Sequence, residues 1–286
     1  MTTQPVTLLA SETRLMDSQH TGRQYRITIS LPLGYFAAPD EDWPFDKSNT
    51  LDQWPVVYVL DGNWYHGLVT DLIRPTRWCG SITDAIVVGI GYPEGDDPVE
   101  AVRVSFTRRD HDLTPVRDEA VEKSMAASHK RPVPNGDAAN FLKFIQHELL
   151  PAIEKDFRAD PSRRILVGHS YGGLFGIFAM LEAPGLFESL ILGSPTLTYG
   201  DRFIIQHEAA FAQENKKLPA KVYLFVGDLE ENIDDTTMTD TLRFAATLQG
   251  REYEGCSLVK QVFADQNHCE VAAPGFQWGL KHVLKR

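Results

Sequence analysis

The chain has 286 residues, 43% of them hydrophobic and 23% charged, a composition typical of a globular protein with a large buried core. Its 28 Lys and Arg stand against 39 Asp and Glu, and the net charge of −11 argues against nucleic acid or an anionic membrane as the partner. No run reaches the roughly 18 apolar residues of a membrane span. The N-terminus lacks the basic and apolar regions of a signal peptide, so we predict a cytoplasmic protein.

Short apolar runs alternate with longer amphipathic ones, which predicts an α/β fold with a mostly parallel sheet. Strands are expected at 24–32, 56–62, 85–92, 164–169, 189–194, 221–227 and 257–264, with 6–16 as an antiparallel edge strand. Helices are expected near 64–74, 137–158, 171–183, 236–249 and 275–284. The helix over 137–158 has an apolar stripe, with Asp137 as its N-cap and a kink at Pro151.

Two polar regions interrupt this alternation. Residues 37–54 contain proline and many charges, which is typical of a surface loop. Residues 93–136 are long, charged and rich in turn residues, and a loop of this length inside a compact domain is usually a lid or a binding loop. We therefore predict one domain over 1–286, with 93–136 inserted beside the active site.

The strongest motif is Gly168-His169-Ser170-Tyr171-Gly172, which fits G-x-S-x-G and is followed by Gly173. It follows the apolar run RILV and precedes the apolar run LFGIFAML, the strand–turn–helix context of a nucleophile elbow. The alternative is a glycine-rich turn without chemistry. Ser170 is therefore the expected nucleophile, and the adjacent His169 is expected to pack in the fold.

A serine hydroxyl needs a general base, which in this fold follows the nucleophile along the chain. Three of the nine histidines, His207, His268 and His282, do so. His268 follows the last expected strand, which places it at the same edge of the sheet as the elbow. His207 falls in the helical run QHEAAFAQE and His282 near the end of the last expected helix, both more typical of surface residues, so His268 is the predicted base.

The acid that orients the base is expected in the loop GDLEENIDD after strand 221–227. Acidic loops are often only solvated surface, and this one offers several carboxylates. We choose Glu230, with Glu231 and Asp228 as alternatives.

Acyl transfer also needs two backbone amides that bind the oxyanion. One is expected from Tyr171, directly after the nucleophile. The other is expected from Asn63, because Gly62 lets the chain turn after strand 56–62. The alternative is an ordinary turn at the Asp-Gly pair.

The segment 103–110 is cationic in an acidic protein. Arg103, Arg108 and Arg109 could bind an anionic group of the substrate, or could form ion pairs within a loop. Trp64, with Tyr65 and Trp78, could line an aromatic substrate cleft, although single aromatic residues more often pack in the core.

Five segments together resemble the esterase family of the α/β-hydrolase superfamily, which includes enterobactin and salmochelin esterases and is related to esterase D. They are VLDGNW, RRDHDLTP, FLKFIQHELLPAIEKDF, RILVGHSYGGLFGIFAMLEAPGLFESLILGSPT and VGDLEE. The resemblance implies an α/β-hydrolase fold with helices on both faces of the sheet and no large cap domain. It also implies cleavage of carboxylic esters, including trilactone siderophores, through an acyl-enzyme and without a metal or organic cofactor.

Matched to the family's motifs, Ser170 is the nucleophile, His268 the base, Glu230 the acid and Asn63 an oxyanion donor. The segment RRDHDLTP matches the family's R-x-x-D-x-T-P stretch, which borders the site. One departure follows SPT, where the family often has paired tryptophans and this chain has Leu-Thr-Tyr at 197–199.

The sequence therefore predicts a serine esterase with a small-molecule ester as its substrate. Acyl transfer to an alcohol or amine would use the same residues, and a catalytically inactive binding module would lack one of them. Nucleotide-binding motifs are missing, since the sequence has no GxxxxGK[ST] and GIGYPEG does not fit GxGxxG. The natural substrate and the oligomeric state stay open.

Overall fold

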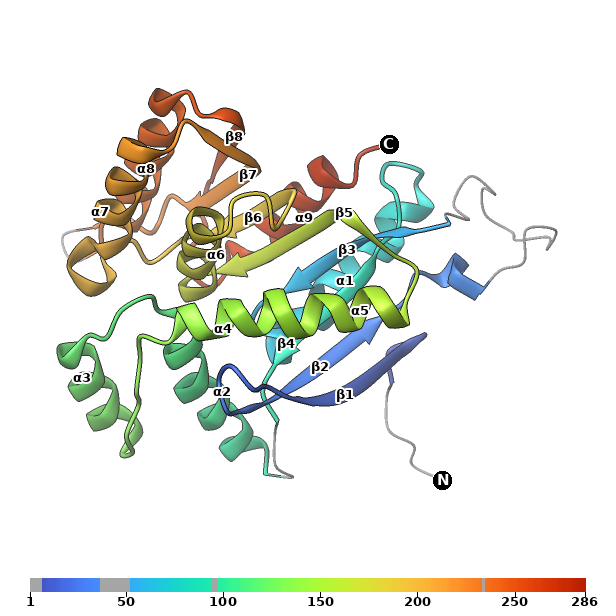
Figure 1. Cartoon of the computed structure of the whole chain (residues 1–286), viewed down its shortest axis with the longest axis horizontal. Helices are drawn as coiled ribbons and strands as arrows, with labels where there is room; N and C mark the ends of the chain where they lie inside the picture. Colours follow the sequence, from blue (N-terminus) through green and yellow to red (C-terminus); the bar gives the residue numbers. More distant parts are fainter. Residues whose placement is uncertain (1–6, 37–51, 94–96, 233–234) are drawn as a thin grey trace.

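The computed structural model describes residues 7–36, 52–93, 97–232 and 235–286. Within these ranges one eight-stranded sheet has the order β1-β2-β4-β3-β5-β6-β7-β8 (Figure 1). β1 and β2 are antiparallel to their neighbours, and β3 to β8 are parallel. The strands are β1 (Ser11–Asp17), β2 (Gln24–Ser30), β3 (Trp54–Val59), β4 (Ile86–Gly91), β5 (Ala159–His169), β6 (Ser189–Gly193), β7 (Lys217–Gly227) and β8 (Glu254–Phe263).

Every strand expected from the sequence is present, including the antiparallel edge strand. β5 and β7 begin several residues earlier than expected. Their first halves lie at the amino edge of the sheet and contain charged, partly exposed residues, so these halves lack the continuous apolar run of a doubly buried strand. The fold is the predicted α/β-hydrolase sheet.

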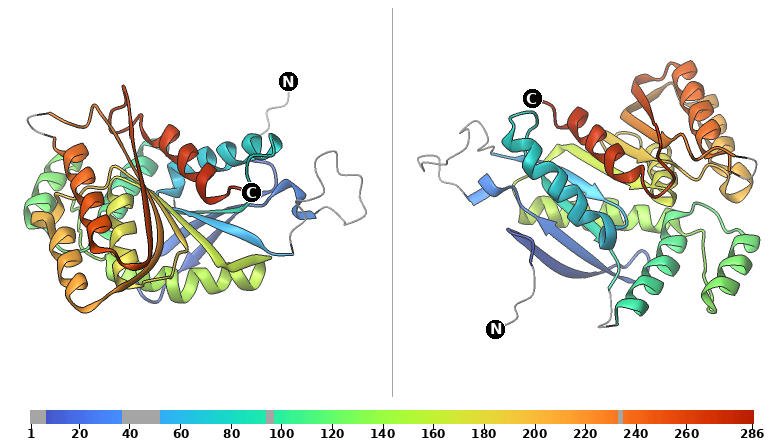
Figure 2. Two further views of the ribbon diagram at one scale, coloured as in Figure 1. Left: turned by 90° about the horizontal axis from the view of Figure 1, so that it is seen from above. Right: turned by 180° about the vertical axis from the view of Figure 1, so that it is seen from behind.

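Helices cover both faces of the sheet (Figure 2). α1 (Gly62–Trp78) and α9 (Ala272–Val283) lie on one face and pack against Val57, Val59 and Ile191. The opposite face is covered by α4 (Ala138–Phe144), α5 (Leu150–Asp156), α6 (Tyr171–Glu182), α7 (Tyr199–Glu214) and α8 (Thr237–Arg251). The two cores hold the sheet rigid, so the loops at its carboxyl edge start from fixed positions.

The segment 138–156 forms the expected long helix, with two local differences. Asp137 stands at the N-cap position, but its side chain makes no capping bond and accepts hydrogen bonds from Arg23 and Asn140 instead. The distortion expected at Pro151 takes the form of a π-helical turn, Ile145–Leu149 (η3), directly before α5. This wider turn accommodates proline, which has no N–H to donate to the preceding turn.

The prediction of a long loop over 93–136 is wrong for its described part, which contains two helices, α2 (Pro98–Leu113) and α3 (Glu119–His129). Each starts at an aspartate, Asp97 or Asp118, whose side chain accepts amide hydrogen bonds from the first turn. The periodicity was hidden because several apolar residues of α2 face solvent. Parts of both expected loops, residues 94–96 and 37–51, lie outside the described residues. A 3-10 turn, η1 (Leu33–Phe36), comes directly before residue 37.

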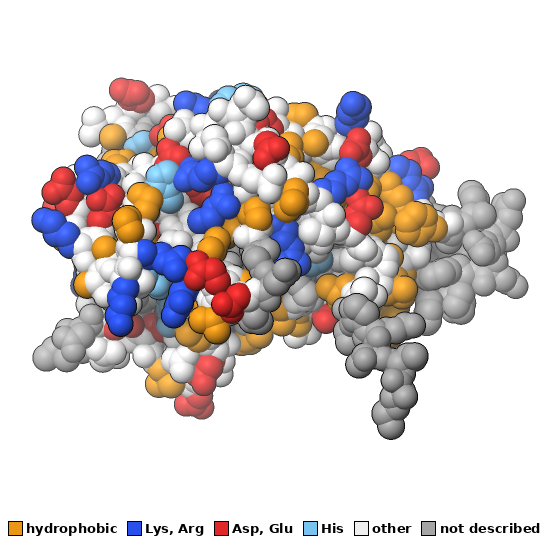
Figure 3. Space-filling model, turned by 90° about the horizontal axis from the view of Figure 1, so that it is seen from below, with side chains coloured by type: hydrophobic (Ala, Val, Ile, Leu, Met, Phe, Trp, Pro, Cys, Tyr) orange, Lys and Arg blue, Asp and Glu red, His pale blue; other side chains and the backbone are white. Residues whose placement is uncertain are grey.

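Charged side chains of both signs are mixed with hydrophobic ones on the face seen in Figure 3. Among the described helices, none has the length and apolar character needed to cross a membrane.

Candidate active site

Ser170 lies at the sharp turn between β5 and α6, with φ 60° and ψ −119°. A positive φ is uncommon for a residue other than glycine and is typical of strained functional turns. The turn also needs glycine beside it, because a Cβ on Gly168 would lie 2.3 Å from the carbonyl oxygen of Gly172. The Ser170 amide donates to the Gly193 carbonyl at 2.9 Å, which fixes the turn on β6. The sequence motif thus has the geometry of a nucleophile elbow.

His268 lies in the loop after β8, and its Nδ1 is 2.5 Å from Oε2 of Glu230. Its ring centroid is 4.7 Å from that of His169, the residue before Ser170, so the imidazole lies beside the elbow. The His268 side chain is 40% exposed. With Nδ1 directed to the carboxylate, Nε2 is the nitrogen left for a proton from a serine.

Glu230 follows β7 and is fully buried. Its second oxygen, Oε1, accepts hydrogen bonds from the Ser194 hydroxyl at 2.6 Å and from the Gly227 amide at 2.8 Å. The carboxylate is therefore held in one orientation, with Oε2 facing His268. This fixed orientation suits a group that orients an imidazole.

The alternative acids have other contacts. Both oxygens of Glu231 accept hydrogen bonds from Thr239, one from its amide and one from its hydroxyl, which fastens the first turn of α8. The Asp228 amide donates to the Phe263 carbonyl, and its Oδ1 is buried without a hydrogen bond within the described residues. Of the three candidates, Glu230 is the one in contact with His268.

His169, His207 and His282 make contacts within the fold. His169 is buried edge-to-face against Tyr65. Burial, with smaller contributions from the neighbouring His268 and Arg109, lowers the pKa of His169 to about 3, so its ring is neutral at pH 7. His207 pairs with Glu182 at 2.7 Å, and His282 donates to the Trp278 carbonyl.

The turn after β3 is built around Asp61, which has a left-handed conformation, and Gly62, the first residue of α1. A Cβ on Gly62 would lie 2.7 Å from the backbone of Gly89, so only glycine fits there. The Asn63 side chain bonds both the amide and the carbonyl of Tyr92, which ties this turn to the end of β4. The backbone position of Asn63 is thereby fixed.

The amides of Asn63 and Tyr171 belong to the first turns of α1 and α6. These helices start at the carboxyl ends of β3 and β5, which are adjacent parallel strands. Helix N-termini carry amides without acceptors inside the helix, and their dipoles favour negative charge. This placement suits the binding of an oxyanion.

The three arginines of α2 have partners within the chain. Arg109 forms a bidentate pair with Asp61, with N–O distances of 2.8 and 3.0 Å, and both side chains are more than nine-tenths buried. Arg108 donates to the Gln24 carbonyl and lies over the rings of Tyr25 and Tyr92. Arg103 is exposed and 3.8 Å from Glu100. For Arg108 and Arg109 the geometry favours the alternative of contacts inside the fold over binding of an anionic substrate.

Asp61→Ala is expected to lower the free energy of unfolding by about 3–5 kcal/mol, because it leaves the Arg109 guanidinium buried without its counter-charge. Urea unfolding followed by circular dichroism measures this. Arg103→Ala, which removes an exposed charge from the same insertion, is the matched control and should change stability by about 0.5 kcal/mol or less. A loss below about 1 kcal/mol for Asp61→Ala would contradict a structural role for the pair.

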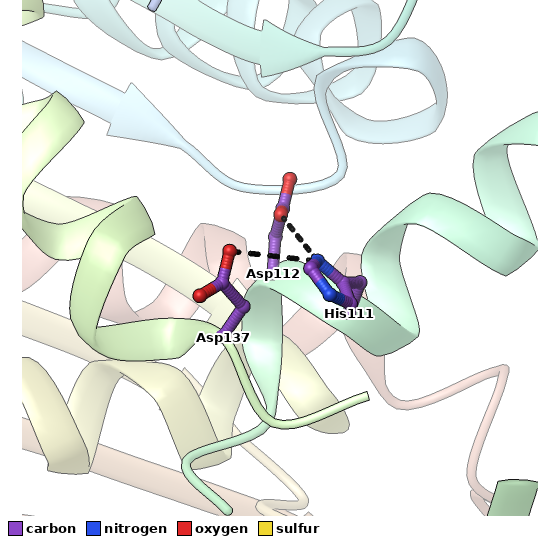
Figure 4. Close-up of side chains that lie close together, drawn as sticks. All are labelled: His111, Asp112 and Asp137. Carbon is purple, nitrogen blue, oxygen red and sulfur yellow. Dashed lines mark ion pairs between the residues drawn. The ribbon is translucent and has the colours of Figure 1, made fainter. Parts of the chain in front are cut away.

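His111, Asp112 and Asp137 lie close together where α2 ends and α4 begins (Figure 4). The Arg23 guanidinium already bridges them, at 2.9 Å from Asp112 and 2.5 Å from Asp137, and it also contacts His111. A cationic side chain among the donor atoms disfavours a metal ion. The cluster is an ion-pair network that fastens the β1–β2 hairpin to the insertion.

Two site residues were missed in the sequence. Ser194, with φ 40°, follows β6 and donates to Glu230, and the Thr196 hydroxyl lies 3.5 Å from that of Ser170. Both belong to the segment GSPT at the carboxyl end of β6, and that position beside the elbow strand was the available signal. Of the aromatic candidates, Trp64 lies beside the site, Tyr65 packs on Phe276, and Trp78 stands exposed at the far end of α1.

The sheet order, the elbow and the loops at the carboxyl edge define an α/β-hydrolase. Comparison with known families agrees: residues 18–255 match the Esterase family, described as "Putative esterase". The chain belongs to this esterase family and is a carboxylic ester hydrolase.

Individual relatives carry names of siderophore esterases. The chain is 28% identical over 281 residues to the ferri-bacillibactin esterase BesA of Bacillus subtilis (strain 168), covering 96% of this chain and 86% of that protein. It is 31% identical over 214 residues to a siderophore triacetylfusarinine C esterase of Aspergillus fumigatus, covering 74% and 64%. Among solved structures, BES protein from Bacillus cereus superposes with a TM-score of 0.79 at 25% identity, covering 100% of this chain and 99% of that one.

Proposed function

We propose that Ser170, His268 and Glu230 form a catalytic triad that hydrolyses ester bonds of siderophore-type substrates through an acyl-enzyme. The observation that carries the proposal is the 2.5 Å contact between His268 Nδ1 and a fully buried Glu230, beside a serine in an elbow conformation. The relatives named as siderophore esterases support the substrate class.

In the first half-reaction, Ser170 Oγ attacks the ester carbonyl while His268 Nε2 accepts its proton. Glu230 orients the imidazole and stabilises the imidazolium that forms. The amides of Asn63 and Tyr171 bind the oxyanion of the tetrahedral intermediate. When the carbon–oxygen bond of the leaving alcohol breaks, the alcohol takes the proton from His268, and the acyl group stays on Ser170.

In the second half-reaction, water attacks the acyl-enzyme, and His268 takes its proton and returns it to Ser170 as the acid leaves. The His268 side chain is 40% exposed, so solvent has access to this part of the proposed site, as hydrolysis of the acyl-enzyme requires.

Incubation with a fluorophosphonate is expected to add one phosphonyl group per chain of the wild-type protein, seen by intact-mass spectrometry, because the activated serine displaces fluoride. Ser170→Ala should acquire no adduct. The matched control, Ser162→Ala, removes another serine of β5 outside the site and should be labelled as fast as wild type. An adduct on Ser170→Ala, or none on wild type, would contradict the proposed nucleophile.

A further inference from the structure

One buried ion pair contacts both turns that carry the proposed oxyanion donors. Arg109 of α2 binds the two carboxylate oxygens of Asp61 at 2.8 and 3.0 Å, and these side chains are only 9% and 2% exposed. Asp61 is the N-cap residue of α1 and directly precedes Gly62 and Asn63. Its carbonyl accepts hydrogen bonds from two amides of the first turn of α1, at 2.9 and 3.1 Å. A shift of Asp61 would therefore move the Asn63 amide.

The same pair contacts the elbow. The Arg109 guanidinium lies 5.2 Å from the ring centroid of Tyr171, whose amide is the second proposed donor. A Cβ built on Gly172 would lie 3.5 Å from Oδ2 of Asp61, so the carboxylate lies against the first turn of α6. The guanidinium also lies 5.9 Å from the ring centroid of Trp64, in the first turn of α1. The ion pair therefore lies between the first turns of α1 and α6.

The pair has a rigid geometry. A guanidinium that makes two parallel hydrogen bonds to one carboxylate is fixed in both distance and orientation. Because Nε and Nη2 of Arg109 both bind Asp61, these donors are not available to an anionic substrate. A buried ion pair gives little net stability compared with apolar side chains of equal volume, since desolvation of both charges offsets their attraction. The distinctive contribution of this pair is therefore the geometry that it imposes on the two turns.

We propose that Arg109 is a positioning residue for the oxyanion hole. Through Asp61 and the Tyr171 ring, it sets the relative position of the Asn63 and Tyr171 amides. This inference rests on the proposed function. A single oxyanion donor contributes about 10²–10³ to kcat, and only when it points to the place where the negative charge develops. Loss of the pair should therefore slow the chemical step and leave substrate binding almost unchanged.

Arg109→Met keeps a long side chain near the two rings and removes the bidentate contact. It should lower kcat for p-nitrophenyl acetate about 10²-fold, with KM changed by less than about threefold. Arg109→Lys keeps the charge without the bidentate geometry, so a loss of about tenfold is expected. The matched control is Arg117→Met, which removes an exposed arginine that pairs with Glu122 in the same insertion. It should keep kcat within about twofold.

A double variant separates positioning from stability. Asp61→Asn combined with Arg109→Met removes both buried charges, and asparagine tolerates the left-handed conformation at position 61. The double variant should regain most of the urea midpoint that Arg109→Met alone loses, whereas its kcat should stay about 10²-fold below wild type. Recovery of kcat together with stability would show a purely structural pair and would overturn the proposal.

A thionoester tests the oxyanion hole directly, and the result does not depend on the amount of folded protein. Sulfur is a larger and weaker acceptor than oxygen, so wild type should hydrolyse p-nitrophenyl acetate faster than p-nitrophenyl thionoacetate. Arg109→Met should reduce this ratio of kcat/KM values about tenfold, because displaced amides no longer favour oxygen. An unchanged ratio overturns the positioning role. Wild-type protein without phosphonate labelling of Ser170 overturns the proposed function, whereas normal labelling with wild-type kcat in Arg109→Met overturns this inference alone.

Discussion

Alanine in place of Ser170 or His268 is expected to lower kcat/KM for p-nitrophenyl acetate by a factor on the order of 10⁴ to 10⁶. Each substitution removes one of two groups that act together, because the Ser170 hydroxyl needs a base and the His268 base needs a hydroxyl to deprotonate. The double variant should therefore be about as slow as the slower single variant, with the residual rate due to oxyanion binding and substrate positioning.

The matched control is His207→Ala, since this imidazole pairs with Glu182 outside the site. It should keep the wild-type rate within about twofold. Retention of more than about a tenth of the wild-type rate by either site variant, or a double variant slower by the product of the two effects, would argue against a single catalytic unit.

Glutamine in place of Glu230 is expected to lower kcat by a factor of about 10³ to 10⁴, whereas Glu231→Gln should change it by no more than about twofold. An amide at position 230 has one acceptor oxygen for three partners: the Ser194 hydroxyl, the Gly227 amide and His268 Nδ1. In either orientation of this amide, its NH2 group faces another hydrogen-bond donor, or His268 must take the tautomer with its proton on Nε2, which cannot accept a proton from Ser170.

The two glutamates are neighbours with equal chemistry, so their comparison isolates the contact with His268. Glu231→Gln loses charge only at the start of α8, where it holds Thr239. Steady-state kinetics on both variants, with thermal melts to verify folding, measures the difference. Equal rates for both would contradict the assignment of Glu230 as the acid of the triad.

The sheet was predictable because six of its strands are parallel, and strands buried on both faces appear as continuous apolar runs. The same rule placed His268 and the acidic loop at the carboxyl edge. Helix α2 was missed because Val99, Val102 and Phe106 face solvent, and α3 because it has no buried residue, so apolar periodicity did not mark a core face in either. Their capping aspartates, Asp97 and Asp118, were the readable signal.

The choice of Glu230 among the acids depended on the family resemblance and not on the local pattern, and the roles of the arginines could not come from sequence alone. Glu230 and Glu231 differ by one position in a loop, and only the path of that loop decides which carboxylate meets His268, 38 residues later. Similarly, Arg109 meets Asp61 across 48 residues. Such contacts depend on how the packed cores align the ends of the strands, and a local sequence pattern does not determine that alignment.

The order of the strands divides the loops at the carboxyl edge of the sheet into two groups, one on each side of the strand order, and the sequence of each group can change independently of the other. Ser170, Glu230 and His268 follow β5, β7 and β8, whereas α1 and the α2–α3 insertion follow β3 and β4, on the other side of β5 in the sheet. Substitutions within the α2–α3 insertion can therefore change that side of the molecule while the residues of the proposed triad stay the same. Relatives that share this sheet can therefore differ in the α2–α3 insertion while they keep the same chemistry at the other strand ends.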